Sequence, residues 1–545
     1  MGGALMQLVA YGAQDVFLTG TPEITFWKVS YRRHTNFAME SIEQTFSGQA
    51  DFGRRVTCTV SRNGDLAYRT YLQVTLPEIN QGLAKYARWM DFIGEQLIAQ
   101  VEVEIGGQRI DRQYGDWMHI WNQVTLSAEQ QRGYFKMIGN TTQLTYITDP
   151  SFAGVNGPCA AAGGPAQVCA PRNALPETTL YIPLQFWFCR NPGLALPLIA
   201  LQYHEVKINL DLRPIGECLW AVSSLTETSG SVSSTSAYQQ SLVAASLYVD
   251  YIFLDTDERR KMAQNPHEYL FEQLQFTGDE SVGSSSNKIK LNFNHPCKEL
   301  VWVVQPDANV DYCNSLIGGT TLYKTLGAQP FNYTDAIDAL PNAIHAFGAP
   351  EATSGANQFI NGSGLFETAG APQNAYTDPL LNRATGFTSA TLTPGGLSSD
   401  TWVGGAFGDG TTMSGLSDAG TFVLAESALD MHCWGENPVV TAKLQLNGQD
   451  RFSEREGSYF DVVQPFQHHT RAPDTGINIY SFALRPEEHQ PSGSCNFSRI
   501  DNATLQLVLS SGSVGGTSTS KVRVYAVNYN VLRVMSGMAG VAYSN

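Results

Sequence analysis

The sequence has little charge and no strongly basic segment. Charged residues make up 15% of its 545 positions, and the formal net charge is -16 at pH 7. A protein that binds nucleic acid needs a basic face that displaces counterions from the phosphates. The basic runs are short, namely Arg32-Arg33-His34, Arg54-Arg55 and Arg259-Arg260-Lys261. We interpret each as a solvated edge or an ion-pair partner, so direct nucleic acid binding is not expected.

Paired cysteine motifs and long apolar runs are also missing. The nine cysteines are scattered and lack Cys-x-x-Cys spacing, which argues against a zinc ribbon or a disulfide scaffold. Most are expected to be free thiols in a reducing compartment. Cys159 and Cys169 share one Gly/Ala/Pro-rich loop, and whether they pair stays open. No apolar run reaches the length of a membrane span, and residues 1–6 do not resemble a signal peptide. A soluble protein made in a cytosol is expected.

Motifs that carry enzyme chemistry are scarce. Neither a phosphate-binding Gly-x-x-x-x-Gly-Lys-Ser/Thr loop nor a Gly-x-Ser-x-Gly elbow occurs. A cupin-type metal enzyme needs a His/Glu cluster around one pocket. The candidate residues do not suggest such a cluster. His468 and His469 would point to opposite faces of a strand. The other candidates are the isolated dyads His204-Glu205 and His267-Glu268, and His489 with Cys495.

Carboxylates are the remaining candidates for catalysis. Two of them at a fixed separation would be needed for a glycosidase, and nothing in the sequence fixes the separation of Glu454, Glu456, Glu487 and Glu488. We therefore expect no enzyme activity, no catalytic residue, no cofactor and no metal site.

What the sequence has in abundance is strand pattern. Apolar and polar residues alternate over residues 101–105, 206–212 and 288–293, which puts one face in a core and one in water. The dipeptides Asn63-Gly64, Gly106-Gly107 and Asn447-Gly448 are typical of two-residue hairpins. Helical periodicity is confined to short pieces such as residues 84–98 and 127–137. The fold class predicted is all-β with short helices and long inserted loops.

An internal repeat indicates that one β-domain is duplicated. The hairpin at Gly106-Gly107 is followed by Gly115-Asp116-Trp117-Met118, and the hairpin at Asn447-Gly448 by Gly457-Ser458-Tyr459-Phe460. We predict that the two hairpins are equivalent and that the aromatic pairs fill a core. A shift of the apolar phase near Tyr525-Ala526 indicates a bulge in the closing strand.

The repeat divides the chain. We predict an N-terminal arm at residues 1–29, a first β-domain at 30–254, a linker helix at 255–266, a second β-domain at 267–534 and a C-terminal tail at 535–545. A Gly/Thr-rich insertion covers about residues 312–420 of the second domain. Because aromatic residues are spaced through this insertion, we predict an ordered outer tower whose aromatics pack on the second domain and on an adjacent subunit.

Four blocks of sequence resemble a known family. Residues 7–20 read QLVAYGAQDVFLTG and are followed by ITFWK at 24–28 and YRRHTNF at 31–37. This opening closely resembles the major capsid proteins of nucleocytoplasmic large double-stranded DNA viruses. Residues 250–260, 446–452 and 482–502 agree with the same family. The resemblance does not cover residues 152–176, 223–240 or most of 312–420.

The resemblance implies two tandem eight-stranded antiparallel jelly rolls and a structural role. Proteins of this family form homotrimeric, pseudo-hexagonal capsomers that tile an icosahedral shell. The partners implied are neighbouring capsomers, minor capsid and penton proteins, and contacts near an internal membrane on the inner side. The implied location is the virion capsid, after synthesis and assembly in the host cytoplasm. A secreted lectin-like jelly roll is the alternative, and it would normally have a signal peptide and disulfides. Whether sugar is attached at Asn140, Asn332, Asn361, Asn496 or Asn502 stays open.

Overall fold

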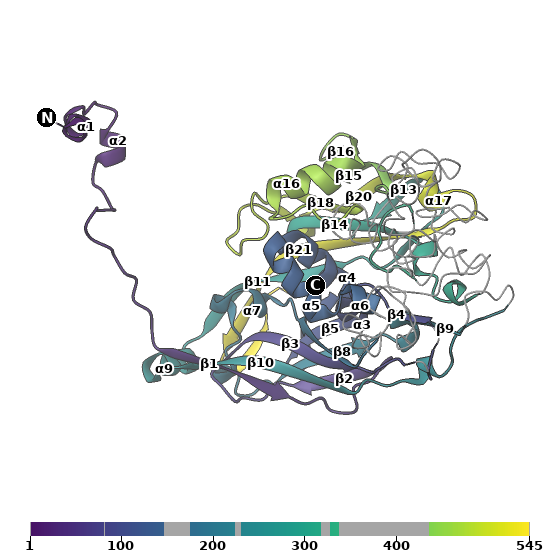
Figure 1. Ribbon diagram of the computed structural model, residues 1–545. Coiled ribbons are helices and arrows are strands. Elements are labelled where there is room, and N and C mark those ends of the chain that lie inside the picture. Colours follow the sequence, from purple (N-terminus) through teal and green to yellow (C-terminus); the bar gives the residue numbers. More distant parts are fainter. Residues whose placement is uncertain are drawn as a thin grey trace, which may run out of the picture.

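The computed structural model describes residues 2–80, 82–84, 86–145, 175–223, 230–317, 328–336 and 435–543. Figure 1 shows two β-rich bodies, one from each half of the chain, and an N-terminal arm that leads away from both. In the arm, only α1 (Gly3–Val9) and α2 (Val16–Thr19) are regular. No helix in the described ranges is long and apolar enough to cross a membrane.

The first half forms a sandwich of two four-stranded antiparallel sheets, ordered β1-β10-β3-β7 and β2-β8-β5-β6. Their bounds are β1 (Phe37–Gln44), β2 (Arg55–Thr59), β3 (Leu66–Leu76), β5 (Ile98–Ile105), β6 (Gln108–Tyr114), β7 (Thr178–Pro183), β8 (Val206–Leu212) and β10 (Ala244–Leu254). A small separate sheet pairs β4 (Tyr86–Trp89) with β9 (Leu219–Val222).

The second half repeats this strand order. Its sheets are β11-β21-β14-β18 and β13-β20-β15-β16. The bounds are β11 (His267–Phe276), β13 (Ser286–Lys290), β14 (Pro296–Pro306), β15 (Val439–Leu446), β16 (Gln449–Asp450), β18 (Ile477–Ser481), β20 (Ala503–Leu509) and β21 (Ser520–Met535). Short strands β12 (Glu280–Val282), β17 (Arg455–Glu456), β19 (Cys495–Asn496) and β22 (Met538–Val541) extend the two sheets. The prediction of two tandem eight-stranded antiparallel jelly rolls is confirmed.

The two predicted hairpins occupy the same place in their jelly rolls. Gly106-Gly107 joins β5 to β6, and Asn447-Gly448 joins β15 to β16. All four residues have positive φ, at 59° and 84° in the first pair and 51° and 80° in the second. This is the geometry that a two-residue hairpin requires. The prediction that they are equivalent is therefore confirmed.

The expectation of a third such hairpin at Asn63-Gly64 is wrong. The strands on either side, β2 and β3, lie in different sheets, and neither residue is among those with positive φ. The segment crosses between the sheets. A Cβ on Gly64 would lie 2.7 Å from the Cβ of Tyr251, so glycine is needed there for close approach and not for a turn.

The predicted bulge in the last long strand is also misplaced. The register shift lies in the partner strand β14, between Cys297 and Glu299, while β21 runs on opposite it. The apolar phase of β21 changes because this part of the strand is buried on both faces. Val524 and Ala526 face the core of the second sandwich, and Tyr525 and Val527 face the first half.

The helices differ in part from those expected. Residues 127–137 were expected to be helical, and α5 (Ala128–Ile138) confirms this. Residues 84–98 were expected to be helical, but they contain β4 and only a short helix, α3 (Ile93–Leu97). Helix α4 (Gly115–Thr125) was not expected from the sequence. The other α-helices in the described ranges are α6 (Thr142–Thr145), α7 (Trp187–Arg190), α8 (Ile215–Cys218), α9 (Thr256–Gln264), α16 (Gln464–His468) and α17 (Ser511–Val514), with a π-helical turn at Tyr459–Val463.

The predicted linker helix is present, whereas the predicted C-terminal tail contains a strand. Helix α9 lies between the halves, and Asp255 caps it by accepting a hydrogen bond from the Thr256 amide. Residues 535–545 were expected to form a tail, but β22 within them pairs with β21. Most of the predicted tower, and the pair Cys159 and Cys169, lie outside the described residues.

A close backbone approach positions α4. A Cβ on Gly115 would overlap the carbonyl oxygens of Glu95 and Ile98. The equivalent Gly457 is equally tight, because its Cβ would overlap the carbonyl oxygen of Val439. Glycine therefore lets the helix after the hairpin start directly against the sandwich in both halves.

We expect Gly115→Ala to lower the free energy of unfolding by about 1 to 3 kcal/mol, because the added methyl group forces the helix away from α3. Gly133→Ala in α5 is the matched control. A Cβ there meets nothing within 4 Å, and alanine is the better helix former, so stability should rise by up to about 1 kcal/mol. Thermal melting of the purified variants measures both. Equal melting temperatures for Gly115→Ala and the wild type would contradict this account.

Candidate functional site

Helix α4 forms an apolar contact between the two halves (Figure 1). Its residues Trp117, Ile120, Trp121 and Val124 are at most 7% exposed. They pack on the outer face of the sheet β11-β21-β14-β18, against Val301, Val303, Ile477, Ile479, Tyr525 and Val527. Trp117 was expected to fill a core, and it packs in the apolar cluster between the two halves, while the next residue, Met118, enters the first core.

A buried carboxylate holds α4 on its own half. Glu95 in α3 is 1% exposed and accepts hydrogen bonds from His119, Asn122 and Tyr134. Phe331 stacks on the ring of His119, with 4.3 Å between ring centroids. Phe331 and its neighbour Tyr333 belong to the predicted insertion, and they pack between the two halves of this chain.

Ion pairs cross the same contact. Asp116 at the start of α4 binds Arg523 of β21 at 2.9 Å and Arg213 at 3.5 Å. Arg190 of α7 binds Glu272 of β11 at 3.2 Å and lies 3.7 Å from the ring centroid of Trp121. The Asp116–Arg523 and Arg190–Glu272 pairs tie two elements of the first half, α4 and α7, to the second, whereas Arg213 binds Asp116 within the first half.

A buried carboxyl of the first half also accepts from the backbone of the second. Asp111 takes a hydrogen bond of 3.2 Å from the Leu274 amide. Burial raises the pKa of Asp111 to about 7. The halves therefore meet through both charged and neutral polar contacts.

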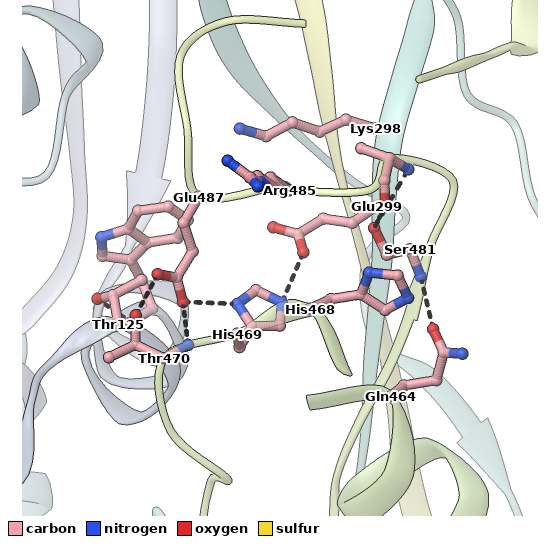
Figure 2. A network of polar contacts seen from close by, with 12 residues as sticks. Thr125, Lys298, Glu299, Gln464, His468, His469, Thr470, Ser481, Arg485 and Glu487 are labelled. Atoms are coloured by element: carbon pink, nitrogen blue, oxygen red, sulfur yellow. Dashed lines mark hydrogen bonds and ion pairs between the residues drawn. The ribbon is translucent and has the colours of Figure 1, made fainter. Parts of the chain in front are cut away.

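A second set of buried charges surrounds His469 (Figure 2). Its Nδ1 donates to Glu487 at 2.9 Å, and its Nε2 donates to Glu299 of β14 at 3.0 Å. The side chains of His469 and Glu299 are each 1% exposed. Glu487 also accepts hydrogen bonds from the amide and the hydroxyl of Thr470. Beside this set, Lys298 binds Glu272 at 2.5 Å.

These contacts shift the pKa of each group. Burial alone would lower the pKa of His469, but the charge of Glu299 and the hydrogen bonds to both carboxylates raise it to about 9. Burial would raise the pKa of Glu299, and the charge and hydrogen bond of His469 outweigh it, so that pKa is lowered. The pKa of Glu487 is lowered for the same reason. At neutral pH His469 is therefore a cation between two carboxylates.

The structure brings together two of the sequence candidates, His469 and Glu487. His468 and His469 end a helix rather than lie on a strand, and His468 hydrogen-bonds to the carbonyl of Leu484. Two further histidine candidates, His204 and His267, contact backbone carbonyls of Ala539 and Met262. Burial lowers the pKa of a third, His489. Within the described ranges there is no group of three or more His, Cys, Asp or Glu that could hold a metal ion.

The carboxylate candidates have different partners. Glu487 is bound to His469, whereas Glu488 pairs with Arg485 at 3.1 Å and Glu454 accepts from Thr441 at 2.7 Å. Of the basic runs, Arg55 pairs with Glu102 and Arg259 with Asp65, each at 2.9 Å.

The asparagines of the Asn-x-Ser/Thr triplets differ in access. Asn140 accepts a hydrogen bond from the Phe92 amide, and Asn332 donates to Gln329 and Ala336. Asn496 and Asn502 are exposed. Asn361 lies outside the described residues.

Sequence reasoning missed the charges that the fold buries. The sequence signal for these buried charges is the position of Lys298 and Glu299 within an otherwise apolar strand segment, residues 297–304. A charged pair within a strand that is otherwise apolar indicates buried partners. Which partners they meet depends on tertiary structure.

The N-terminal arm is the other candidate site, because it exposes many large apolar side chains. Phe17 is 92% exposed, Phe26 102% and Trp27 86%. None of the residues of α1 or α2 is buried. Exposed apolar segments of this size usually meet a partner surface.

Comparisons with known proteins agree with this architecture. Residues 25–255 match the family model described as the major capsid protein N-terminus, and residues 258–540 match that of the large eukaryotic DNA virus major capsid protein. Over the full length of both chains, the sequence is 75% identical to the major capsid protein of Phaeocystis pouchetii virus. It is 38% identical to that of Paramecium bursaria Chlorella virus 1, again over both full lengths.

Solved structures show the same fold. A chain in the quasi-atomic model of the PBCV-1 virus capsid is 32% identical, with a TM-score of 0.59, covering 96% of this chain and 100% of that one. The Faustovirus major capsid protein has a TM-score of 0.60 at 12% identity, covering 98% and 96% of the two chains. At that identity the likeness shows the fold alone.

We expect the stability of the protein to fall as pH rises from about 6.5 to 9. The folded-state pKa of His469 lies above its usual value, so its contribution is complete below pH 6.5 and is lost through pH 9. This contribution is on the order of 3 kcal/mol. His469→Gln should remove that part of the pH dependence and cost about 3 to 5 kcal/mol at pH 7, because it leaves Glu299 buried without its counter-charge.

The neighbouring substitution His468→Gln is the matched control, since His468 has only one backbone contact. Calorimetric melting between pH 6 and 9.5 provides the comparison. If His469→Gln kept the wild-type pH profile, the assignment of the charge to His469 would be wrong.

Proposed function

This chain belongs to the family of large eukaryotic DNA virus major capsid proteins, and from that premise we propose that it forms homotrimeric, pseudo-hexagonal capsomers that tile an icosahedral shell. The observation that carries the proposal is the identical strand order of the two jelly rolls, held together by α4. Two similar bodies in each chain become six in a closed trimer. Such a ring gives six similar outer edges for contacts with neighbouring capsomers.

The protein is a component of the virion capsid, and the proposal extends to its partners. Minor capsid proteins and penton proteins would contact the capsomer, and the N-terminal arm would lie on the inner side, near an internal membrane. The exposed apolar side chains of the arm support an interacting role. The residues of the insertion would form the outer surface. Synthesis and assembly in the host cytoplasm are part of the same proposal, as are the absence of enzyme activity and of direct nucleic acid binding.

Light scattering after size-exclusion chromatography, with electron microscopy of the same fraction, tests the proposal. Particles of three chains with a hexagonal outline are expected. A monomer at micromolar concentration, or a round ring with another number of chains, would refute the capsomer proposal.

We expect removal of residues 2–29 to leave trimers intact but to prevent their assembly into shells. The arm has no buried residue and contributes no strand to either sandwich, so trimer mass and melting temperature should not change. Shell formation should fall at least about tenfold, because exposed apolar anchors provide much of the energy of a contact. Reassembly of dissociated capsomers, counted by electron microscopy, is the measurement.

A variant with Arg32→Gln and Arg33→Gln, which keeps every apolar side chain of the arm, is the control. It should assemble like the wild type. Normal shells from the truncated chain would show that the arm has no role in assembly.

A further inference from the structure

The repeat places three apolar side chains of the second half on an uncovered surface. When Gly115 is aligned with Gly457 without gaps, Ile120 of α4 falls on Val462, Trp121 on Val463 and Val124 on Phe466. In the first half these positions are 0%, 7% and 3% exposed, because α4 packs on the second jelly roll. In the second half they are 55%, 37% and 83% exposed. We call Val462, Val463 and Phe466 the helix face.

The first half has an uncovered sheet face in the matching position. The outer face of β11-β21-β14-β18, which α4 covers, is formed by residues such as Val301, Ile479 and Tyr525. The same three strands of the other jelly roll, β3, β7 and β10, carry Tyr71, Tyr181 and Tyr248 on their outer face. In the first half, Tyr248 of β10 lies opposite Tyr71 of β3. In the second half, the equivalent strands place Tyr525 of β21 opposite Val301 of β14. We call these three residues the tyrosine face.

The tyrosine face is ordered and accessible. The rings of Tyr71 and Tyr248 stack with 5.2 Å between centroids, and Tyr181 lies 6.2 Å from Tyr71. Tyr181 is 41% exposed, and none of the described hydrophobic clusters includes any of the three. Tyrosine supplies a large contact area with little loss of side-chain entropy, and it is enriched where proteins bind one another.

We propose that the helix face of one chain docks on the tyrosine face of a second copy of this chain. This contact between chains would resemble the contact within one chain between α4 and the outer face of the sheet β11-β21-β14-β18. A second copy of the chain is the expected partner, because within one chain the equivalent helix, α4, already covers the equivalent sheet face of the second jelly roll. The inference rests on the proposed capsomer and names the surface that closes it.

The contact is head to tail, since the two faces belong to different halves. Each chain has one free helix face and one free tyrosine face, so copies can follow one another around a ring. In a closed trimer all three pairs of faces are satisfied.

Substitutions on each face test the inference in the full-length chain. Phe466→Asp and Tyr181→Asp each put a charge into the desolvated contact, and the dissociation constant should rise by about 30-fold or more. Light scattering should then show monomers for both variants at concentrations where the wild type is trimeric. Both positions are exposed in the single chain, so the melting temperature of the monomers is checked to show that they are folded.

Val440→Asp is the control. Val440 is 47% exposed and lies on β15, in the opposite sheet of the second jelly roll. This variant should stay trimeric. Trimers from both Phe466→Asp and Tyr181→Asp would overturn the proposed contact while leaving the capsomer intact. A monomeric wild type would overturn the capsomer and the contact together.

Cross-linking shows the direction of the contact. A chain with both Phe466→Cys and Tyr181→Cys, treated with a short bismaleimide, should give covalent trimers. Each single variant should give only the background from the native thiols. Strong dimers from Phe466→Cys alone would show that helix faces meet each other, which contradicts the head-to-tail contact.

Discussion

The outer face of the sheet β11-β21-β14-β18 is apolar, and this face has to be covered. Its strands β14 and β21 are buried on both sides, one side in the second core and the other against α4. Each square ångström of apolar surface removed from water contributes about 25 cal/mol. Covering the face with a helix from the other half therefore helps to join the two domains. Phe271, Leu532, Val534 and Ala539 of the second half add to this joint, because they pack in the core of the first half. The relative position of the jelly rolls, and with it the shape of any assembly, depends on these contacts.

Charges at the same contact determine its register. Asp116, Arg190 and Glu272 are bound across the two halves, and Lys298, Glu299 and His469 are buried beside them. Buried ion pairs add little net stability, but a buried charge without its partner costs about 3 to 5 kcal/mol. A shift of one half along the other would leave several such charges unpaired. The apolar helix thus provides the affinity between the halves, and the ion pairs restrict them to one arrangement.

The strand pattern, the two equivalent hairpins and the duplication could be predicted from the sequence, because alternation and positive φ are local properties. The family blocks then led to the jelly-roll topology. Local reasoning failed where a residue serves a distant partner. The apolar phase of β21 changes because Tyr525 and Val527 meet the first half, and not because of a bulge in that strand. Trp117 belongs to the contact between halves for the same reason. His468 and His469 were expected to point to opposite faces of a strand, and only the fold brings Glu299 and Glu487 to His469.

A single type of contact, a helix on an outer sheet face, operates within each chain and, as we propose, again between chains. Electron cryomicroscopy of the purified full-length protein tests it most directly. The account predicts a three-fold particle in which Phe466 of each chain lies on the sheet that contains Tyr71, Tyr181 and Tyr248 of the next chain. A particle in which Val462, Val463 and Phe466 face solvent, or in which α4 is detached from Tyr525, would contradict it.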